Sequence, residues 1–149
     1  RGVRRRGGVR GDRGMSDAQK IPPYSIVEMT NRHPRFYELV GPLLSRREVA
    51  QDLGAPVWDD DDKTWFAAVA GDVVIGMVAV RRKEVCSFYV APAVRGEAVG
   101  YALLRAALRV LPASRATATD ASRPLFERFG FESHGRRGRY HTMRRDIAK

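Results

Sequence analysis

The stretch Phe88–Leu104, with the sequence FYVAPAVRGEAVGYALL, is the most informative part of the chain. It begins with β-forming residues, passes through a loop that contains Pro92, and ends in a long segment with an apolar stripe. This order predicts a strand, a loop, and a helix that begins near Gly96. The backbone N–H groups at a helix N-terminus lack partners within the helix and attract anions. We therefore interpret the stretch as a cradle for a diphosphate group, to which Arg95 adds a positive charge and Gly96 and Gly100 allow close approach.

The segments on either side predict an α/β domain, of the α+β mixed-sheet kind. Turn residues and apolar periodicity indicate seven strands: Tyr24–Thr30, Thr64–Ala70, Val73–Arg81, Glu84–Ala91, Arg115–Thr119, Phe131–Arg137 and Arg139–Asp146. They indicate helices over His33–Leu44, Ser45–Leu53, Gly96–Leu111 and Ser122–Phe129, with Ser45 and Glu48 predicted to form a capping box. In this order, three antiparallel strands are followed by a crossover helix and then by a strand that returns parallel to the third. Such an order predicts a central mixed sheet with helices on both faces.

The same stretch resembles the acetyl-CoA loop of the GNAT superfamily of N-acyltransferases. The family pattern is Gln/Arg-x-x-Gly-x-Gly/Ala; Arg95 and Gly100 fit it, whereas Ala98 stands where glycine is usual. A second motif, ATDASRPLFERFGF over Ala118–Phe131, resembles the family's A-T-x-A-G-R-P-L-Y-x-x-x-G-F. The two motifs lie at the expected separation, and the predicted strand order agrees with the family over residues 24–146.

The resemblance implies a donor substrate, acetyl-CoA. The pantetheine arm would lie in a gap between the strand at Glu84–Ala91 and the parallel strand at Arg115–Thr119, and a main-chain N–H near Val90 would polarise the thioester carbonyl. The acceptor would be a primary amine, and the acceptor molecule stays open among small amines, antibiotics, protein amines and aminoacyl-tRNA. The residues that this implies for binding the donor are Phe88, Tyr89, Val90, Arg95, Gly96, Glu97, Ala98, Val99, Gly100, Tyr101 and Phe126.

Glu84 is the candidate catalytic residue, as the base that deprotonates the amine. Some family members carry a base glutamate at the corresponding position, and strict strand alternation places Glu84 on one face with Cys86, Phe88 and Val90. The alternative is that Glu84 is a charge at a strand end, paired with a neighbouring basic side chain across a turn. We do not expect Cys86 to act as a nucleophile, because a lone small cysteine in a strand is usually a core residue.

Phe126 stands where many family members have a tyrosine that protonates the departing thiolate. Phenylalanine has no hydroxyl, so another group would have to serve, or the thiolate would leave unaided. The hydroxyls that remain as candidates are those of Ser122, Tyr140 and Tyr89. If the pocket accepts a hydroxyl at this position, Phe126→Tyr is expected to speed turnover.

Positive charge lies at the two ends of the chain. The 149 residues suffice for one domain and carry a net charge of +10. Residues 1–14 hold six arginines and one aspartate, residues 134–149 hold five arginines, one lysine and one aspartate, and the centre is neutral. We expect residues 1–20 to be a disordered Arg/Gly-rich tail and residues 21–149 to form one N-acetyltransferase-like domain. The tail is either an arm that contacts nucleic acid or translated sequence ahead of a true start at Met15, and we favour the second interpretation.

Composition narrows the remaining choices. No apolar stretch approaches the roughly 18 residues of a membrane span, and a single cysteine leaves no disulfide within the chain. We expect a cytoplasmic monomer or homodimer without a metal site, since the three histidines are scattered. The acidic run Asp59–Asp62 is either a solvated loop or a rim that attracts cationic amines. The alternative to an enzyme is a protein on the same fold that is directed to nucleic acid through its basic ends, or that binds CoA without catalysis.

Overall fold

The computed structural model describes residues 21–53 and 57–147, so the predicted tail and the predicted end of the second helix at Gly54 and Pro56 lie outside the described residues. The strands are β1 (Ser25–Met29), β2 (Thr64–Ala70), β3 (Val73–Arg81), β4 (Glu84–Val90), β5 (Arg115–Thr119), β6 (Glu132–Arg137) and β7 (Tyr140–Arg144). The helices are α2 (Phe36–Leu39), α3 (Gly41–Leu44), α4 (Arg47–Leu53), α5 (Glu97–Val110) and α6 (Arg123–Glu127), with a 3₁₀ turn at Pro92–Val94. Each predicted strand is therefore present, with ends that differ by at most two residues.

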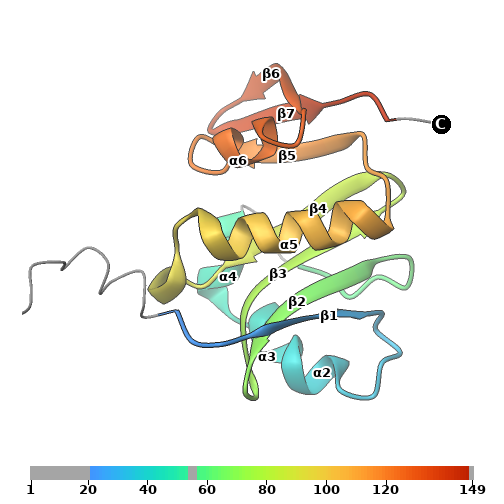
Figure 1. Cartoon of the computed structure of the whole chain (residues 1–149), viewed down its shortest axis with the longest axis vertical. Helices are drawn as coiled ribbons and strands as arrows, with labels where there is room; N and C mark the ends of the chain where they lie inside the picture. Colours follow the sequence, from blue (N-terminus) through green and yellow to red (C-terminus); the bar gives the residue numbers. More distant parts are fainter. Residues whose placement is uncertain (1–20, 54–56, 148–149) are drawn as a thin grey trace, which may run out of the picture.

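The sheet is mixed, as predicted, and its strand order is β1-β2-β3-β4-β5-β7-β6. All neighbouring strands are antiparallel except β4 and β5, which are parallel (Figure 1). That parallel ladder has only two pairs, Glu84 with Arg115 and Val85 with Ala116. Beyond Val85 the two strands separate, so the rest of β4 has a main-chain edge that β5 does not cover.

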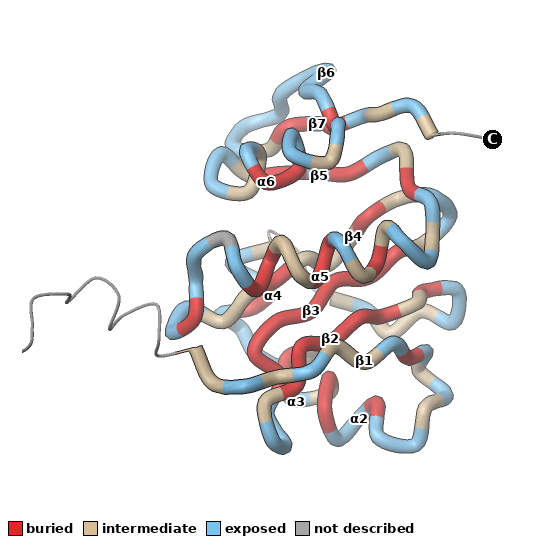
Figure 2. Tube along the Cα trace, viewed as in Figure 1, coloured by how far each residue is buried: buried red, intermediate tan, exposed pale blue. Residues whose placement is uncertain are grey.

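Helices cover both faces of the sheet, and each face has its own core. Figure 1 shows α5 lying across one face, while α2, α3 and α4 lie on the other. The buried positions follow the strands and the inward side of α5 (Figure 2). The α5 side is centred on Leu103, Phe126 and Phe131, and the α2–α4 side on Phe36 and Trp65. The strands in the middle of the sheet are therefore buried on both faces.

A β-bulge in β4 changes which side chains share a face. Cys86 pairs with Ala79 and Tyr89 pairs with Met77, so two residues of β4 oppose a single residue of β3. The extra residue is Ser87, whose φ of 56° lies in the left-handed region. The predicted single face of Glu84, Cys86, Phe88 and Val90 is therefore wrong. Phe88 and Val90 pack with the α5 core, whereas Cys86 packs with the α2–α4 core.

The helical region before β2 also differs from its prediction. Three short helices replace two longer ones, and Ser45 is the C-terminal cap of α3 instead of the N-terminal cap of the next helix. Because α4 begins at Arg47, Ser45 is not the residue that precedes it, and the predicted capping box with Glu48 does not form; the Ser45 hydroxyl donates instead to the Pro42 carbonyl oxygen at 3.2 Å. Within the described part of the chain, no helix has the length and apolar content needed to cross a membrane.

Candidate functional site

A cavity of about 690 Å³ opens where β4 and β5 separate. Its walls come from the end of α4, the length of β4, the start of α5, the Thr119–Ser122 segment and the turn between β6 and β7. Phe88 and Leu125, which belong to the α5 side, line it together with Cys86, which belongs to the opposite side. The cavity therefore reaches both faces of the sheet, through the gap that the short parallel ladder leaves.

One wall is the start of α5, where sequence analysis placed the diphosphate. Gly96 is the N-terminal cap, with a φ of 135°, and no side chain caps the helix there. The first N–H groups of this 14-residue helix thus lack a side-chain partner, as an anion site requires. Ala98 is the second residue of the helix and needs no positive φ, so alanine fits where the family pattern has glycine.

Gly100 has a packing role that the sequence did not predict. A Cβ atom at this position would lie 2.9 Å from Leu125 Cδ2 and 3.0 Å from Phe88 Cζ. Both contacts are closer than side chains normally approach, so Gly100 allows α5 to pack against α6 and β4. Gly96 has no atom within 4 Å of such a Cβ, and its positive φ is the reason for glycine there.

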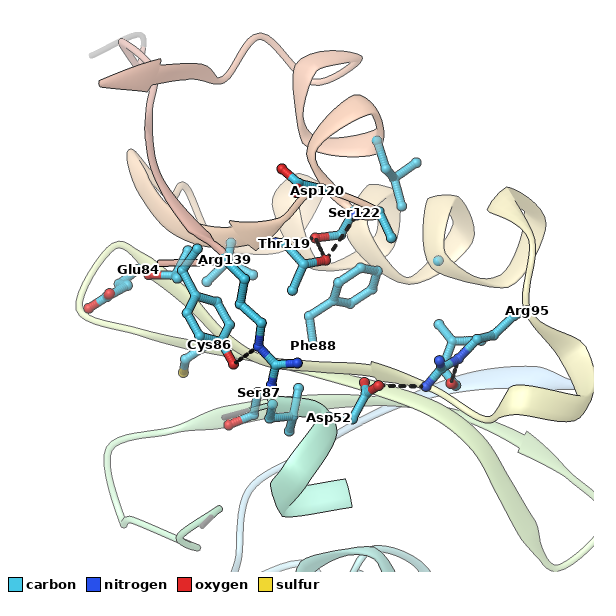
Figure 3. A pocket seen from close by; sticks show the side chains of 18 of the residues that line it. Asp52, Glu84, Cys86, Ser87, Phe88, Arg95, Thr119, Asp120, Ser122 and Arg139 are labelled. Atoms are coloured by element: carbon cyan, nitrogen blue, oxygen red, sulfur yellow. Dashed lines mark hydrogen bonds and ion pairs between the residues drawn. The ribbon is translucent and has the colours of Figure 1, made fainter. Parts of the chain in front are cut away.

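Arg95 is engaged by the protein itself. Its Nε donates to the Val90 carbonyl oxygen at 2.9 Å, and Nη2 lies 3.1 Å from Asp52 Oδ1 at the end of α4 (Figure 3). The guanidinium also lies 5.7 Å from the centre of the Tyr89 ring. Arg95 was predicted to offer its charge to a diphosphate, but in this structure it is paired with the Asp52 carboxylate. A bound anion would therefore compete with Asp52 for Arg95.

The main-chain N–H of Val90 faces the gap between β4 and β5. The next N–H along the strand, that of Ala91, donates to the Ile75 carbonyl oxygen of the β2–β3 side at 2.9 Å. Successive residues of a strand direct their N–H groups to opposite edges, so the N–H of Val90 is directed away from β3. This agrees with the predicted position of a donor that polarises a carbonyl in the gap.

Glu84, Cys86, Arg139 and Tyr140 are among the residues that line the cavity. Glu84 has no ion pair or hydrogen bond from its carboxylate to any residue that the structure describes, so the predicted pairing with a neighbouring turn residue is not seen. Burial raises the pKa of the Cys86 thiol, which keeps the sulfur protonated and argues against a thiolate mechanism.

Asp120, at the end of β5, also lines the cavity but is held by other groups. Its Oδ1 lies 2.6 Å from Nε2 of His141, a buried side chain of β7, and its Oδ2 lies 3.4 Å from Arg136 Nη2. The hydrogen bond from His141, followed by the positive charge of Arg136, holds the pKa of Asp120 below its ordinary value. Asp120 is consequently a weaker base than a carboxylate without such partners.

The candidate hydroxyls differ in their access to the cavity. Ser122 and Tyr140 line it, whereas Tyr89 is buried on the α2–α4 side. The Ser122 Oγ accepts from the Thr119 N–H at 2.9 Å and does not cap α6 (Figure 3). The Tyr140 hydroxyl accepts from Arg139 Nε at 2.9 Å, which leaves its own proton available to donate.

Phe126 is enclosed in the core instead of lining the cavity. Its ring makes edge contacts with Phe88 at 5.7 Å and with Phe131 at 5.5 Å between ring centres, and only 1% of the residue is exposed. A hydroxyl added there would enter an apolar environment, so the structure argues against a gain from Phe126→Tyr. Of the other residues predicted to bind the donor, Phe88, Val90, Arg95, Gly96 and Gly100 line the cavity, and Tyr89, Ala98, Val99 and Tyr101 are not among its lining residues. The side chain of Glu97 lies outside what the structure describes.

The acidic run Asp59–Asp62 lies outside the cavity lining. Its carboxylates face partners of their own: Asp62 lies 2.9 Å from Arg81, Asp60 lies 3.6 Å from Lys63, and Asp59 accepts from the Tyr37 hydroxyl. Asp60 and Asp62 thus have basic partners, whereas Asp59 and Asp61 accept from the uncharged Tyr37 and Asn31. The position of the run outside the cavity lining argues against the interpretation as a rim that attracts amines.

Asp52 and Arg139 are cavity residues that sequence analysis missed. Asp52 is a polar residue near the end of a short helix, and Arg139 is one of several arginines in a basic C-terminal segment, so neither stood out in the sequence. The flanking turn residue Gly138 marked the hairpin, but no local pattern indicates that its tip reaches α4. Both residues enter the site through tertiary packing.

A splayed mixed sheet with an uncapped helix beside the splay places this chain in the acyltransferase fold class. The chain belongs to the GNAT family, because the model of the acetyltransferase (GNAT) domain matches residues 30–144. A search of curated proteins returned no match.

Solved structures show the same fold at low identity. ElaA of Escherichia coli has a TM-score of 0.64 and 18% identity, with 83% of this chain and 100% of that chain covered. An acyl-CoA N-acyltransferase from Pseudomonas aeruginosa has a TM-score of 0.62 and 16% identity, over 83% and 100% of the two chains. A GNAT family acetyltransferase from Elizabethkingia anophelis, solved with acetyl-CoA bound, has a TM-score of 0.52 and 13% identity, over 83% and 98%.

Proposed function

We propose that this protein is an N-acetyltransferase that moves the acetyl group of acetyl-CoA to a primary amine. The observation that carries the proposal is the cavity, which joins the N-terminus of α5, where no side chain caps the helix, to Glu84, a carboxylate without a partner among the described residues. The donor and the acceptor can thus approach a common point, the β4–β5 gap, from opposite sides. This arrangement favours direct transfer over a covalent intermediate on the enzyme.

The donor fits the side of the cavity that faces α5. Its diphosphate would accept hydrogen bonds from the first N–H groups of α5, where an anion is also favoured by the helix dipole. The pantetheine amides would pair with the main-chain edge of β4 that β5 leaves uncovered beyond Val85. Phe88 and Leu125 provide an apolar wall for the methylene groups of the arm.

The chemistry follows from the groups at the gap. The amine nitrogen attacks the thioester carbonyl carbon, whose oxygen accepts a hydrogen bond from the Val90 N–H. Glu84 takes the proton that the amine loses, because it is the carboxylate of the cavity without a partner among the described residues. The carbon–sulfur bond then breaks, and the CoA thiolate takes a proton, for which Tyr140 is the best-placed hydroxyl.

The test combines donor binding with turnover. Acetyl-CoA at 100 times its Kd is expected to stabilise the fold by about 2.7 kcal/mol, which a thermal melt measures. Glu84→Gln should leave the acetyl-CoA affinity unchanged and lower kcat by roughly 10²- to 10⁴-fold on a panel of amines. Glu132→Gln is the matched control, since Glu132 is an exposed glutamate of β6 outside the cavity lining.

Two results would count against the proposal. A melting temperature that does not respond to acetyl-CoA would remove the donor. Tight binding of acetyl-CoA without acetylation of any amine or protein in a broad panel would favour a CoA-binding protein without catalysis.

A further inference from the structure

We propose that the acceptor is amino-acid-like, a small molecule that carries a carboxylate as well as the primary amine, and that Arg139 binds this carboxylate. The inference rests on the proposed function in one respect, which is that the amine is received at Glu84. It adds the chemical class of the acceptor and the residue that selects it.

Arg139 reaches into the cavity from the turn between β6 and β7. Its Nε donates to the Tyr140 hydroxyl at 2.9 Å, and its Nη2 donates to the Gln51 carbonyl oxygen of α4 at 2.8 Å. The guanidinium lies 5.1 Å from the centre of the Tyr140 ring. Figure 3 shows the side chain extending from the hairpin toward the side of the cavity that holds Asp52 and Ser87. Two elements that are far apart in the sequence therefore hold this cation in one place.

The hydrogen bonds of Arg139 orient its charge without neutralising it. Both acceptors are uncharged, and no carboxylate lies within ion-pair distance among the residues that the structure describes. Arginine has five N–H donors, and within the described chain Nη1 has no hydrogen-bond partner. A guanidinium that is fixed but not neutralised is suited to bind a carboxylate through two parallel hydrogen bonds.

The other cavity charges show why the pair Arg139 and Glu84 stands out. The second cation of the lining, Arg95, is paired with Asp52, and Asp120 is paired with His141 and Arg136. Within the described residues, the lining thus has one arginine and one carboxylate whose charges are not compensated. A zwitterionic amino acid has the complementary pair of charges, whereas a simple amine would leave Arg139 without a counter-charge.

The experiment uses pairs of amines that differ by one carboxylate. The pairs are tyramine and tyrosine, tryptamine and tryptophan, histamine and histidine, and, for a longer separation of the two groups, propylamine and 4-aminobutyrate. The full-length protein is compared with Arg139→Gln, Arg139→Lys and the matched control Arg137→Gln. Arg137 is an exposed arginine of the same hairpin outside the cavity lining. Melting temperature and acetyl-CoA affinity are measured for each variant.

We expect the wild type to prefer the carboxylate-bearing member of at least one pair, by roughly 10- to 100-fold in kcat/KM. Arg139→Gln should abolish this preference, mainly through KM. Arg139→Lys should restore part of it, and Arg137→Gln should keep all of it. A side chain that only tethers the hairpin to α4 would not change the ratio within a pair, because both members would be affected alike.

Other results separate this inference from the proposed function. Turnover without preference for the carboxylate, or a preference that survives Arg139→Gln, overturns the inference and leaves the N-acetyltransferase in place. If Arg139→Gln weakens acetyl-CoA binding and keeps the preference for the carboxylate, Arg139 binds the donor instead of the acceptor. This result also overturns the inference. If no amine is turned over, calorimetry of the same carboxylates in the presence of CoA decides: binding that depends on Arg139 supports the inference, and no binding overturns it.

Discussion

Among the described residues, the cavity has three carboxylates, Asp52, Asp120 and Glu84, which differ in the side chains that they contact. Asp52 holds Arg95 across the gap between α4 and β4, and Asp120 is held by a buried histidine. Of these three, Glu84 alone has no partner among the described residues, and for this reason we propose it as the carboxylate that accepts a proton from a bound amine. Identical chemical groups thus acquire different roles through the side chains placed beside them.

The pair of Asp52 and Arg95 leads to a prediction about the donor. Asp52→Asn should tighten acetyl-CoA binding by roughly 2- to 5-fold, because the diphosphate would no longer compete with a carboxylate for Arg95. The range is modest because the side chains of Arg95 and Asp52 are 46% and 40% exposed, so solvent screens the pair. Calorimetric titration measures the affinity, and Asp72→Asn, which removes an exposed carboxylate next to Arg35, is the control. An unchanged or weaker affinity would show that the pair does not restrain Arg95.

The bulge in β4 is the feature that matters most at the level of elements. Without the bulge, regular alternation through Ser87 would place Phe88 and Val90 on the same face as Cys86. The bulge turns Phe88 and Val90 toward α5 and leaves Cys86 facing the opposite core. Under the proposed function, the bulge gives the donor side an apolar wall while Glu84 stays with the acceptor side.

Two substitutions of Ser87 test the bulge. Its φ of 56° suits glycine and is costly for a β-branched residue. Ser87→Val is expected to lower the free energy of unfolding by about 1–3 kcal/mol and to weaken acetyl-CoA binding. Ser87→Gly should keep both close to the wild type. Urea denaturation and calorimetry give the two quantities, and equal stability of the two variants would mean that the strand adopts another register.

Across the whole molecule, the sheet consists of two parts that meet at the short parallel ladder. Strands β1 to β4 form one part, strands β5, β7 and β6 form the other, and the cavity lies where they separate. The excess positive charge of the sequence is concentrated in residues 1–14 and 134–149, and of these Arg139 lines the cavity. The cavity itself combines three carboxylates with two arginines, so its binding properties do not follow from the net charge.

Removal of residues 1–14 is a test at this scale. An Arg/Gly-rich segment with valine as its only apolar residue can bury little surface, so a chain that begins at Met15 should keep its melting temperature and its acetyl-CoA affinity. If the segment contacts nucleic acid, its removal should abolish salt-dependent binding to RNA or DNA and leave both other quantities unchanged. A fall of several degrees in melting temperature would show instead that the segment packs on the domain.

The strands, and the long helix whose start we propose as the anion site, could be predicted from the chain alone. These features depend on local signals: β-forming runs that end at glycine or proline, an apolar stripe with helical spacing, and glycines beside Arg95. Residues close together in the chain set each of them, so no knowledge of distant contacts was needed. The order of the elements then allowed the mixed sheet to be predicted.

The arrangement inside the cavity depended on contacts that no local pattern encodes. The bulge at Ser87 is a relation between two strands, since it exists only where two residues of β4 face one of β3. The ion pair of Asp52 with Arg95 needs α4 to pack beside β4, and the bond from Arg139 to Gln51 joins residues 88 positions apart. Periodicity along one strand or helix determines which of its faces is buried, but the neighbour that each side chain meets depends on how the elements pack.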